Sequence, residues 1–278
     1  MGLAHLPPEL LLQIFSQCTP DALDFVSRTC PFFERFVTEH AVALCRQILD
    51  VLYSNSAFDP QTKASLARQS VWHPALSPIQ ELQMLWYRVC AVQDILDDVA
   101  LKEAALQKIG EVLCDEERTV RELIPYGFCL MWEFKDAIDS AKSGGAKGTK
   151  TNPTEDFVKS LAGAELDVLY LAAGLSAALL LKASQGHSSK AEYSDTPLNP
   201  PGPEHYVLIE VALTKGIGYV HATIQNCPDM SNEMALLDYG WGSFLRKGNQ
   251  NTKLLQGARA KREAEQRQRE SEDVLPSG

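Results

Sequence analysis

The sequence lacks the patterns that mark disulfide-rich and metal-binding proteins. Its seven cysteines form no Cys-x-x-Cys pair and are irregularly spaced, and its six histidines are not paired at helical spacing. These absences argue against a disulfide framework and against a zinc site. We therefore expect reduced thiols, buried as small apolar side chains in a protein of the cytosol or nucleus, and no metal or other cofactor.

A membrane-length apolar run and an excess of basic residues are missing as well. The most apolar run, 168–181, has 14 residues, whereas a bilayer requires about 20, so it predicts a buried helix. The formal net charge is −10, from 36 acids and 26 bases. Because nucleic acids and anionic membranes are bound by basic surfaces, we expect neither as a partner. Residues 1–5 lack a basic region followed by an apolar run, so we expect no secretory leader.

What is present is the composition of a folded, helical protein. The chain has 278 residues, 45% of them apolar and 22% charged, which is typical of one to two globular domains with a real core. Ser77-Pro78-Ile79-Gln80 has the form of a capping box. Apolar residues then recur every three or four positions to Val99, which predicts a long helix, continued with or without a break through Leu106, Ile109 and Leu113. We expect a mainly α fold.

The first 54 residues predict three helices. Prolines and capping residues mark their starts at Pro7-Pro8, Thr19-Pro20-Asp21 and Pro31, because proline is favoured at the first helical position and threonine caps free N–H groups. A polar break follows at 55–60. The remaining chain is predicted to contain an acidic helical region (61–139), a flexible linker (140–152), a helical C-terminal part (153–256) with an internal linker (184–203), and a charged tail (257–278). The tail is expected to be a solvated helix or disordered.

Most of the net charge lies in the acidic region. Residues 77–139 contain 13 acids and 6 bases. A solvated helical face is the simplest interpretation, and attraction of a basic partner is the alternative.

Three weaker patterns occur in the C-terminal part. The apolar run 206–213 fits a short strand or a turn of buried helix, because it is too short for its period to decide. Gly216 and Gly218 match part of a dinucleotide loop, but His221 occupies the third glycine position, so we interpret them as a turn between packed elements. Tyr239, Trp241 and Phe244 are candidate contacts to a target protein, with core packing as the alternative.

One stretch near the amino end resembles the F-box family. Its residues are Leu6-Pro7-Pro8-Glu9-Leu10-Leu11-Leu12-Gln13-Ile14-Phe15-Ser16, followed by Leu23, Val26-Ser27, Thr29-Cys30 and Phe33. The match has no gap over residues 6–33. It departs from the family pattern at four positions, where leucine, aspartate, a basic residue and tryptophan are usual and this chain has Cys18, Ala22, Pro31 and Phe33.

The resemblance implies that residues 1–54 bind the Skp adaptor of Skp–cullin–F-box ubiquitin ligases and, through it, cullin and RING subunits. The chain would then be a substrate-recognition adaptor that presents an unknown protein for ubiquitination. It would not itself be an enzyme, and we expect no catalytic residue. The residues implied in or just beneath the adaptor interface are Leu6, Pro7, Leu10, Ile14, Phe15, Leu23, Val26, Cys30 and Phe33.

Two alternatives remain open from the sequence. An F-box protein can act with the Skp adaptor outside the ligase, in trafficking or transcription. Otherwise the match is accidental, and the chain is a helical binding protein or an enzyme with a site between Tyr206 and Phe244.

Overall fold

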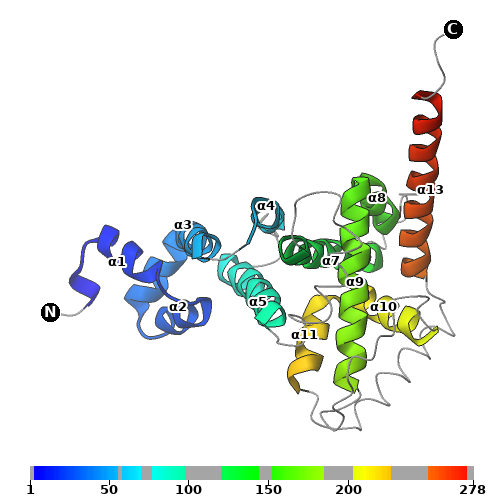
Figure 1. The fold of residues 1–278 in the computed structure, drawn as a ribbon. Coiled ribbons are helices and arrows are strands. Elements are labelled where there is room, and N and C mark those ends of the chain that lie inside the picture. Colours follow the sequence, from blue (N-terminus) through cyan, green and yellow to red (C-terminus); the bar gives the residue numbers. More distant parts are fainter. Residues whose placement is uncertain are drawn as a thin grey trace. The chain divides into compact units, whose positions relative to one another are not determined.

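The structure is a computed structural model, and it describes residues 3–55, 58–69, 77–97, 120–143, 152–184, 203–226 and 250–273. Within these ranges the chain forms eleven α-helices, one short 3₁₀ helix and no strand. The expectation of a mainly α fold is confirmed (Figure 1). The chain divides into two compact units, Met1–Gln93 and Asp94–Gly278, which are described separately.

The first unit begins with the three helices that the sequence predicts. After the 3₁₀ helix η1 (Leu3–His5) come α1 (Pro8–Phe15), α2 (Pro20–Ser27) and α3 (Pro31–Asn55). Each α-helix has proline as its first residue, where a backbone N–H would have no helical partner in any case. Thr19 caps α2, because its side chain accepts a hydrogen bond from the Ala22 N–H at 3.3 Å.

Two further helices complete this unit, α4 (Pro60–Gln69) and most of α5 (Pro78–Asp97). The capping box at the start of α5 forms as predicted: the Ser77 N–H donates to Gln80 Oε1 at 3.0 Å, and the Gln80 N–H donates to Ser77 Oγ at 3.3 Å. Helix α4 lies almost entirely within the predicted helical region 61–139, although no separate helix was predicted there. Asp59 begins it by accepting hydrogen bonds from the Gln61 and Thr62 N–H groups at 2.7 and 3.2 Å.

One apolar cluster forms the core of the first unit, and α5 contributes to it. Its fully buried members are Leu11, Phe15, Leu23, Val37, Leu44, Cys45, Ile48, Leu82 and Leu85. Polar contacts also join α5 to the earlier helices, since Gln83 donates to Asp21 Oδ1 at 3.2 Å and the Cys45 thiol donates to the Pro78 carbonyl at 3.4 Å. The compact unit therefore extends beyond residue 54, into the segment named above as the acidic region.

The second unit is built around α9 (Gly163–Ser184). The helices α7 (Val120–Ser143), α10 (Pro203–Lys215), α11 (Ile217–Asn226) and α13 (Gln250–Asp273) all pack against α9, while α8 (Pro153–Ser160) packs against α7 and α13. Asn152 caps α8, because its side chain accepts a hydrogen bond from the Thr154 N–H at 3.2 Å. Figure 1 shows α9, in green, between α10 and α7.

The structure decides two of the alternatives in this unit. Residues 206–213 lie within α10, so the short strand is wrong. The segment lacks a helical period because neighbouring helices cover it on several sides, and Val207, Leu208 and Ile209 are all buried. Residues 257–273 continue α13, so this part of the charged tail is a helix, and residues 140–143 of the predicted linker belong to α7.

Helix α9 contains the apolar run noted in the sequence. By length and composition Gly163–Leu180 could cross a membrane, and α10 with α11 passes the same test as a pair bent by 108°. However, 56% of the Gly163–Leu180 window is buried, and α9 packs against α7 and α10. This burial is typical of the core helix of a globular unit. The absence of a membrane partner stays a prediction.

Candidate partner-binding surface

The F-box-like residues occupy α1, α2 and the start of α3, and their placement separates them into two sets. The first set supports the surface from beneath. Phe15 and Leu23 are buried in the core of the first unit. Leu6, Val26 and Phe33 are partly buried and pack against the same core. The Phe15 ring meets the Phe33 ring edge-on, with centroids 5.6 Å apart.

The second set faces solvent. Pro7 is exposed, and Leu10 and Ile14 are 45% and 41% exposed. Leu10 and Ile14 are four residues apart, so they lie on one face of α1. Leu11 is buried instead, which shows that α1 is amphipathic despite its three consecutive leucines. Cys30 is half-buried at the end of the α2–α3 turn.

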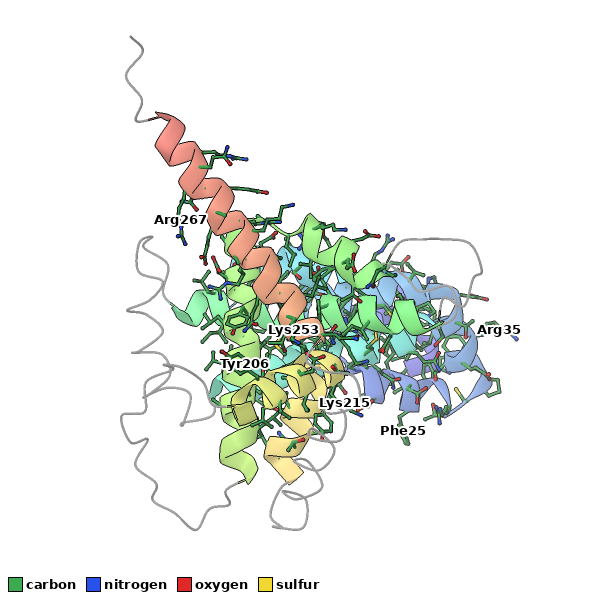
Figure 2. All side chains as sticks on the ribbon, turned by 90° about the vertical axis from the view of Figure 1, so that its right-hand side faces the viewer. Phe25, Arg35, Tyr206, Lys215, Lys253 and Arg267 are labelled. Carbon is green, nitrogen blue, oxygen red and sulfur yellow. The ribbon has the colours of Figure 1, made fainter. Side chains whose placement is uncertain are left out.

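Two exposed aromatic residues in the same helices were not among the predicted interface residues. Phe25 of α2 is 71% exposed, and Figure 2 shows its side chain pointing away from the ribbon. Phe32 of α3 is 44% exposed, and its ring stacks on Phe36 with centroids 6.4 Å apart. Helical spacing could have predicted the exposure of Phe25. It follows the buried Leu23 by two residues, so the two side chains point to opposite sides of α2.

Exposed apolar side chains are unevenly distributed along the chain. Among the described residues, all seven large apolar side chains classed as exposed lie in the first unit: Leu3, Leu10, Ile14, Phe25, Phe32, Val42 and Tyr87. Five of them lie between residues 3 and 32. We call these five (Leu3, Leu10, Ile14, Phe25 and Phe32) the exposed apolar set. Contiguous groups of large exposed apolar side chains are typical of surfaces that bind another protein.

The thiols near this surface are poorly suited to nucleophilic chemistry. Burial raises the pKa of Cys18, which also packs partly against the core in place of the family's leucine. Burial, together with the nearby Glu81 carboxylate, raises the pKa of Cys45 to about 12. Both thiols are therefore protonated at neutral pH, and a thiol is a weak nucleophile compared with a thiolate.

Metal-binding residues do not gather in the described part of the chain, where the structure contains no group of three or more His, Cys, Asp or Glu side chains placed to hold an ion. The cysteines there, at positions 18, 30, 45, 90 and 129, are not joined by disulfide bonds. What this surface offers is apolar contact area.

The second candidate site lies only partly within the described residues. Tyr239, Trp241 and Phe244 lie outside them, so their role as target contacts stays a prediction. Gly216 separates α10 from α11 with φ of 80°, and its N–H donates to the Ala212 carbonyl at 2.8 Å. This is the left-handed glycine that commonly ends a helix, which agrees with the predicted turn at Gly216. Gly218 instead belongs to the first turn of α11.

Comparison of the chain with family models, curated proteins and solved structures finds no match. Any functional assignment therefore depends on the residues of the F-box-like segment and on where they lie in the first unit.

Proposed function

We propose that this chain is the substrate-recognition adaptor of a Skp–cullin–F-box ubiquitin ligase, and that it binds the Skp adaptor through α1, α2 and the start of α3. The observation that carries the proposal is the exposed apolar set. Four of its five members lie on α1, α2 and α3, which contain the F-box-like residues, and Leu3 lies just before them in η1. Phe15 and Leu23 of the same pattern are buried in the core of the first unit.

The energetics of such a surface require most of its side chains to act together. Full burial of a Leu, Ile or Phe side chain contributes about 1.5–3 kcal/mol, and members of the exposed apolar set have already buried part of their area. Association costs about 4–15 kcal/mol. Two or three partly buried side chains would offset only the lower part of this range, so the proposal expects a continuous contact that includes Pro7 and the half-buried residues around it.

In ubiquitin transfer, this chain would act only by positioning the target protein. Holding a target lysine close to a ubiquitin-loaded carrier raises the effective concentration of the reacting groups without any chemistry by the adaptor. Under this proposal the first unit binds the ligase, and residues beyond it hold the target.

The experiment is affinity purification of the full chain from cells with the proteasome blocked. The most informative variant is Leu10→Glu with Ile14→Glu, because both side chains are exposed and their replacement should leave the core intact. A pair of alanines at Leu6 and Pro7 should also abolish recovery of the adaptor, but Leu6 packs against the core, so that pair tests folding as well. Val42→Glu is the matched control, since Val42 is equally exposed but lies outside residues 6–33.

The proposal expects the wild-type chain and Val42→Glu to recover the Skp adaptor together with cullin, and the α1 double variant to recover neither. Recovery of the adaptor by the double variant at the wild-type level would contradict the proposed interface. Recovery of the adaptor without cullin would contradict the ligase assignment and favour a role outside it.

A further inference from the structure

Helix α13 has two halves that differ in burial. In the half from Gln250 to Arg262, Thr252 and Leu255 are fully buried and several neighbours are partly buried. From Glu263 to Arg269 every side chain is exposed. Figure 2 labels Lys253 in the packed half and Arg267 in the exposed half.

A carboxylate from another helix caps the start of α13. Glu210 of α10 accepts hydrogen bonds from the backbone N–H groups of Asn251 and Thr252 at 3.3 and 2.9 Å. The side chains of the same two residues also donate to Glu210, at 2.8 and 2.9 Å. The first N–H groups of a helix have no partner within it and carry partial positive charge. The negative charge of Glu210 therefore holds α13 against α10.

Further along, α13 is held by its arginines. Arg259 Nε donates to Asp167 Oδ1 of α9 at 2.5 Å, and the Arg259 guanidinium lies 4.7 Å from the centre of the Tyr170 ring. Arg262 donates to the Lys159 carbonyl at 3.5 Å. These contacts are largely electrostatic and partly exposed to water, so salt should weaken them.

The packed and the exposed halves of α13 also differ in charge. Residues 250–262 contain four bases and no acid, whereas residues 263–273 contain five acids and two bases. In the described part of α13, Leu255 is the only fully buried large apolar side chain. Ion pairs between residues four apart stabilise the exposed half as a helix. They join Lys261 to Glu265 at 3.8 Å and Arg267 to Glu263 at 3.4 Å.

We propose that α13 is a strap held on the second unit mainly by charge, and that it detaches from α9 and α10 as one piece when those charges are screened or removed. The helices α7 to α11 stay folded when it leaves, because α7 packs against α8, α9 and α10, and α9 packs against α10 and α11, independently of α13. Detachment exposes to solvent the surfaces of α8, α9 and α10 against which α13 packs, whether or not the first unit binds the Skp adaptor.

The experiment is hydrogen–deuterium exchange of the full chain, followed by mass spectrometry, at about 50 mM and about 500 mM salt, where the screening length falls severalfold. The variants are Glu210→Gln and Asp167→Asn. Asp156→Asn is the matched control, because Asp156 is an exposed acid of α8 in the same unit. Peptides covering 251–262 report the strap, and peptides covering 166–180 report α9.

High salt or either test variant should speed exchange in 251–262 by about fivefold, the effect expected of exposed ion pairs and capping carboxylates. Exchange in 166–180 should not change, and Asp156→Asn should behave like the wild type. Equal exchange of 251–262 under all conditions would overturn the proposal. So would simultaneous loss of protection in 166–180, because α13 would then be part of one cooperative fold.

Discussion

Gly127 of α7 and Ala172 of α9 lie so close that a methyl group on Gly127 would come within 2.7 Å of the Ala172 Cβ and 2.9 Å of the Val168 carbonyl oxygen. No real Cβ tolerates these distances, and one of the two obstacles is backbone. The absence of a side chain at position 127 therefore permits the close packing of α7 against α9 on which the second unit depends.

Replacing Gly127 by alanine should accordingly destabilise the protein by about 1–3 kcal/mol, the usual cost of overpacking. Gly174→Ala is the matched control, because a methyl group there meets nothing within 4 Å. That change should stabilise α9 by up to about 1 kcal/mol, since alanine favours a helix over glycine. Urea unfolding measures both, and effects of the same sign would contradict the packing argument.

Titration of Cys45 should make the first unit less stable at alkaline pH. Its pKa rises from 9.0 to about 12, chiefly because it is buried and also because of Glu81. The folded state therefore keeps a proton that the unfolded chain releases above pH 9. This contribution to stability is fully present below pH 9 and is lost as the pH rises towards 12, at up to about 1.4 kcal/mol per pH unit.

Comparison of the wild type with Cys45→Ala isolates this titration, because all other groups are common to both proteins. Alanine should cost stability at pH 8 by leaving a small cavity. The difference in unfolding free energy between the two proteins should shrink by about 1 kcal/mol or more between pH 8 and pH 10.5, as measured by urea unfolding. A constant difference over this range would show that Cys45 does not keep its proton.

Two phenylalanines should separate stability from partner binding. Phe15 is buried against Phe33 and Phe36, with ring centroids 5.6 and 5.8 Å away. Phe15→Ala should therefore cost about 3–5 kcal/mol. Phe25 is mostly exposed, so Phe25→Ala should change the unfolding free energy by less than about 0.5 kcal/mol. If Phe25 belongs to the partner surface, its variant should still weaken adaptor binding, whereas a folded variant with wild-type affinity would remove Phe25 from that surface.

Helix α5 should matter to the first unit although it lies outside the F-box-like residues. Leu82 is fully buried in the same cluster as Leu11 and Leu44. Leu82→Ala should cost about 2–5 kcal/mol, whereas Leu10→Ala, at an exposed position, should cost less than about 1 kcal/mol. Thermal unfolding of the two variants checks this order, and equal costs would show that α5 is not part of the core.

The sequence predicts best those features that depend on neighbouring residues. Thr19 and Ser77 form the caps expected of them, because capping needs only a side chain and an N–H group three positions away. The spacing of apolar residues in 206–213 could not distinguish a strand from a helix, because helices distant in the sequence cover α10 on several sides. The close packing of Gly127 against Ala172 was not predictable either, because these residues belong to helices that are far apart in the sequence.

The candidate surface was predictable in outline and incomplete in detail. The F-box-like pattern falls on helices that have both buried and exposed apolar residues, and it gives equal weight to buried Phe15 and exposed Ile14. Only the fold separates residues that support the surface from residues that form it. Phe25 and Phe32 were missed because they occupy positions that the pattern does not specify.

The most direct test of the account is the affinity of the purified full chain for purified Skp adaptor, measured by calorimetry. We expect one adaptor to bind per chain. The Leu10→Glu and Ile14→Glu double variant should bind about a hundredfold more weakly, because each side chain would lose about 1.4 kcal/mol or more, while Val42→Glu should bind as the wild type does. No binding by the wild-type chain, or equal affinity of the double variant, would contradict the central claim.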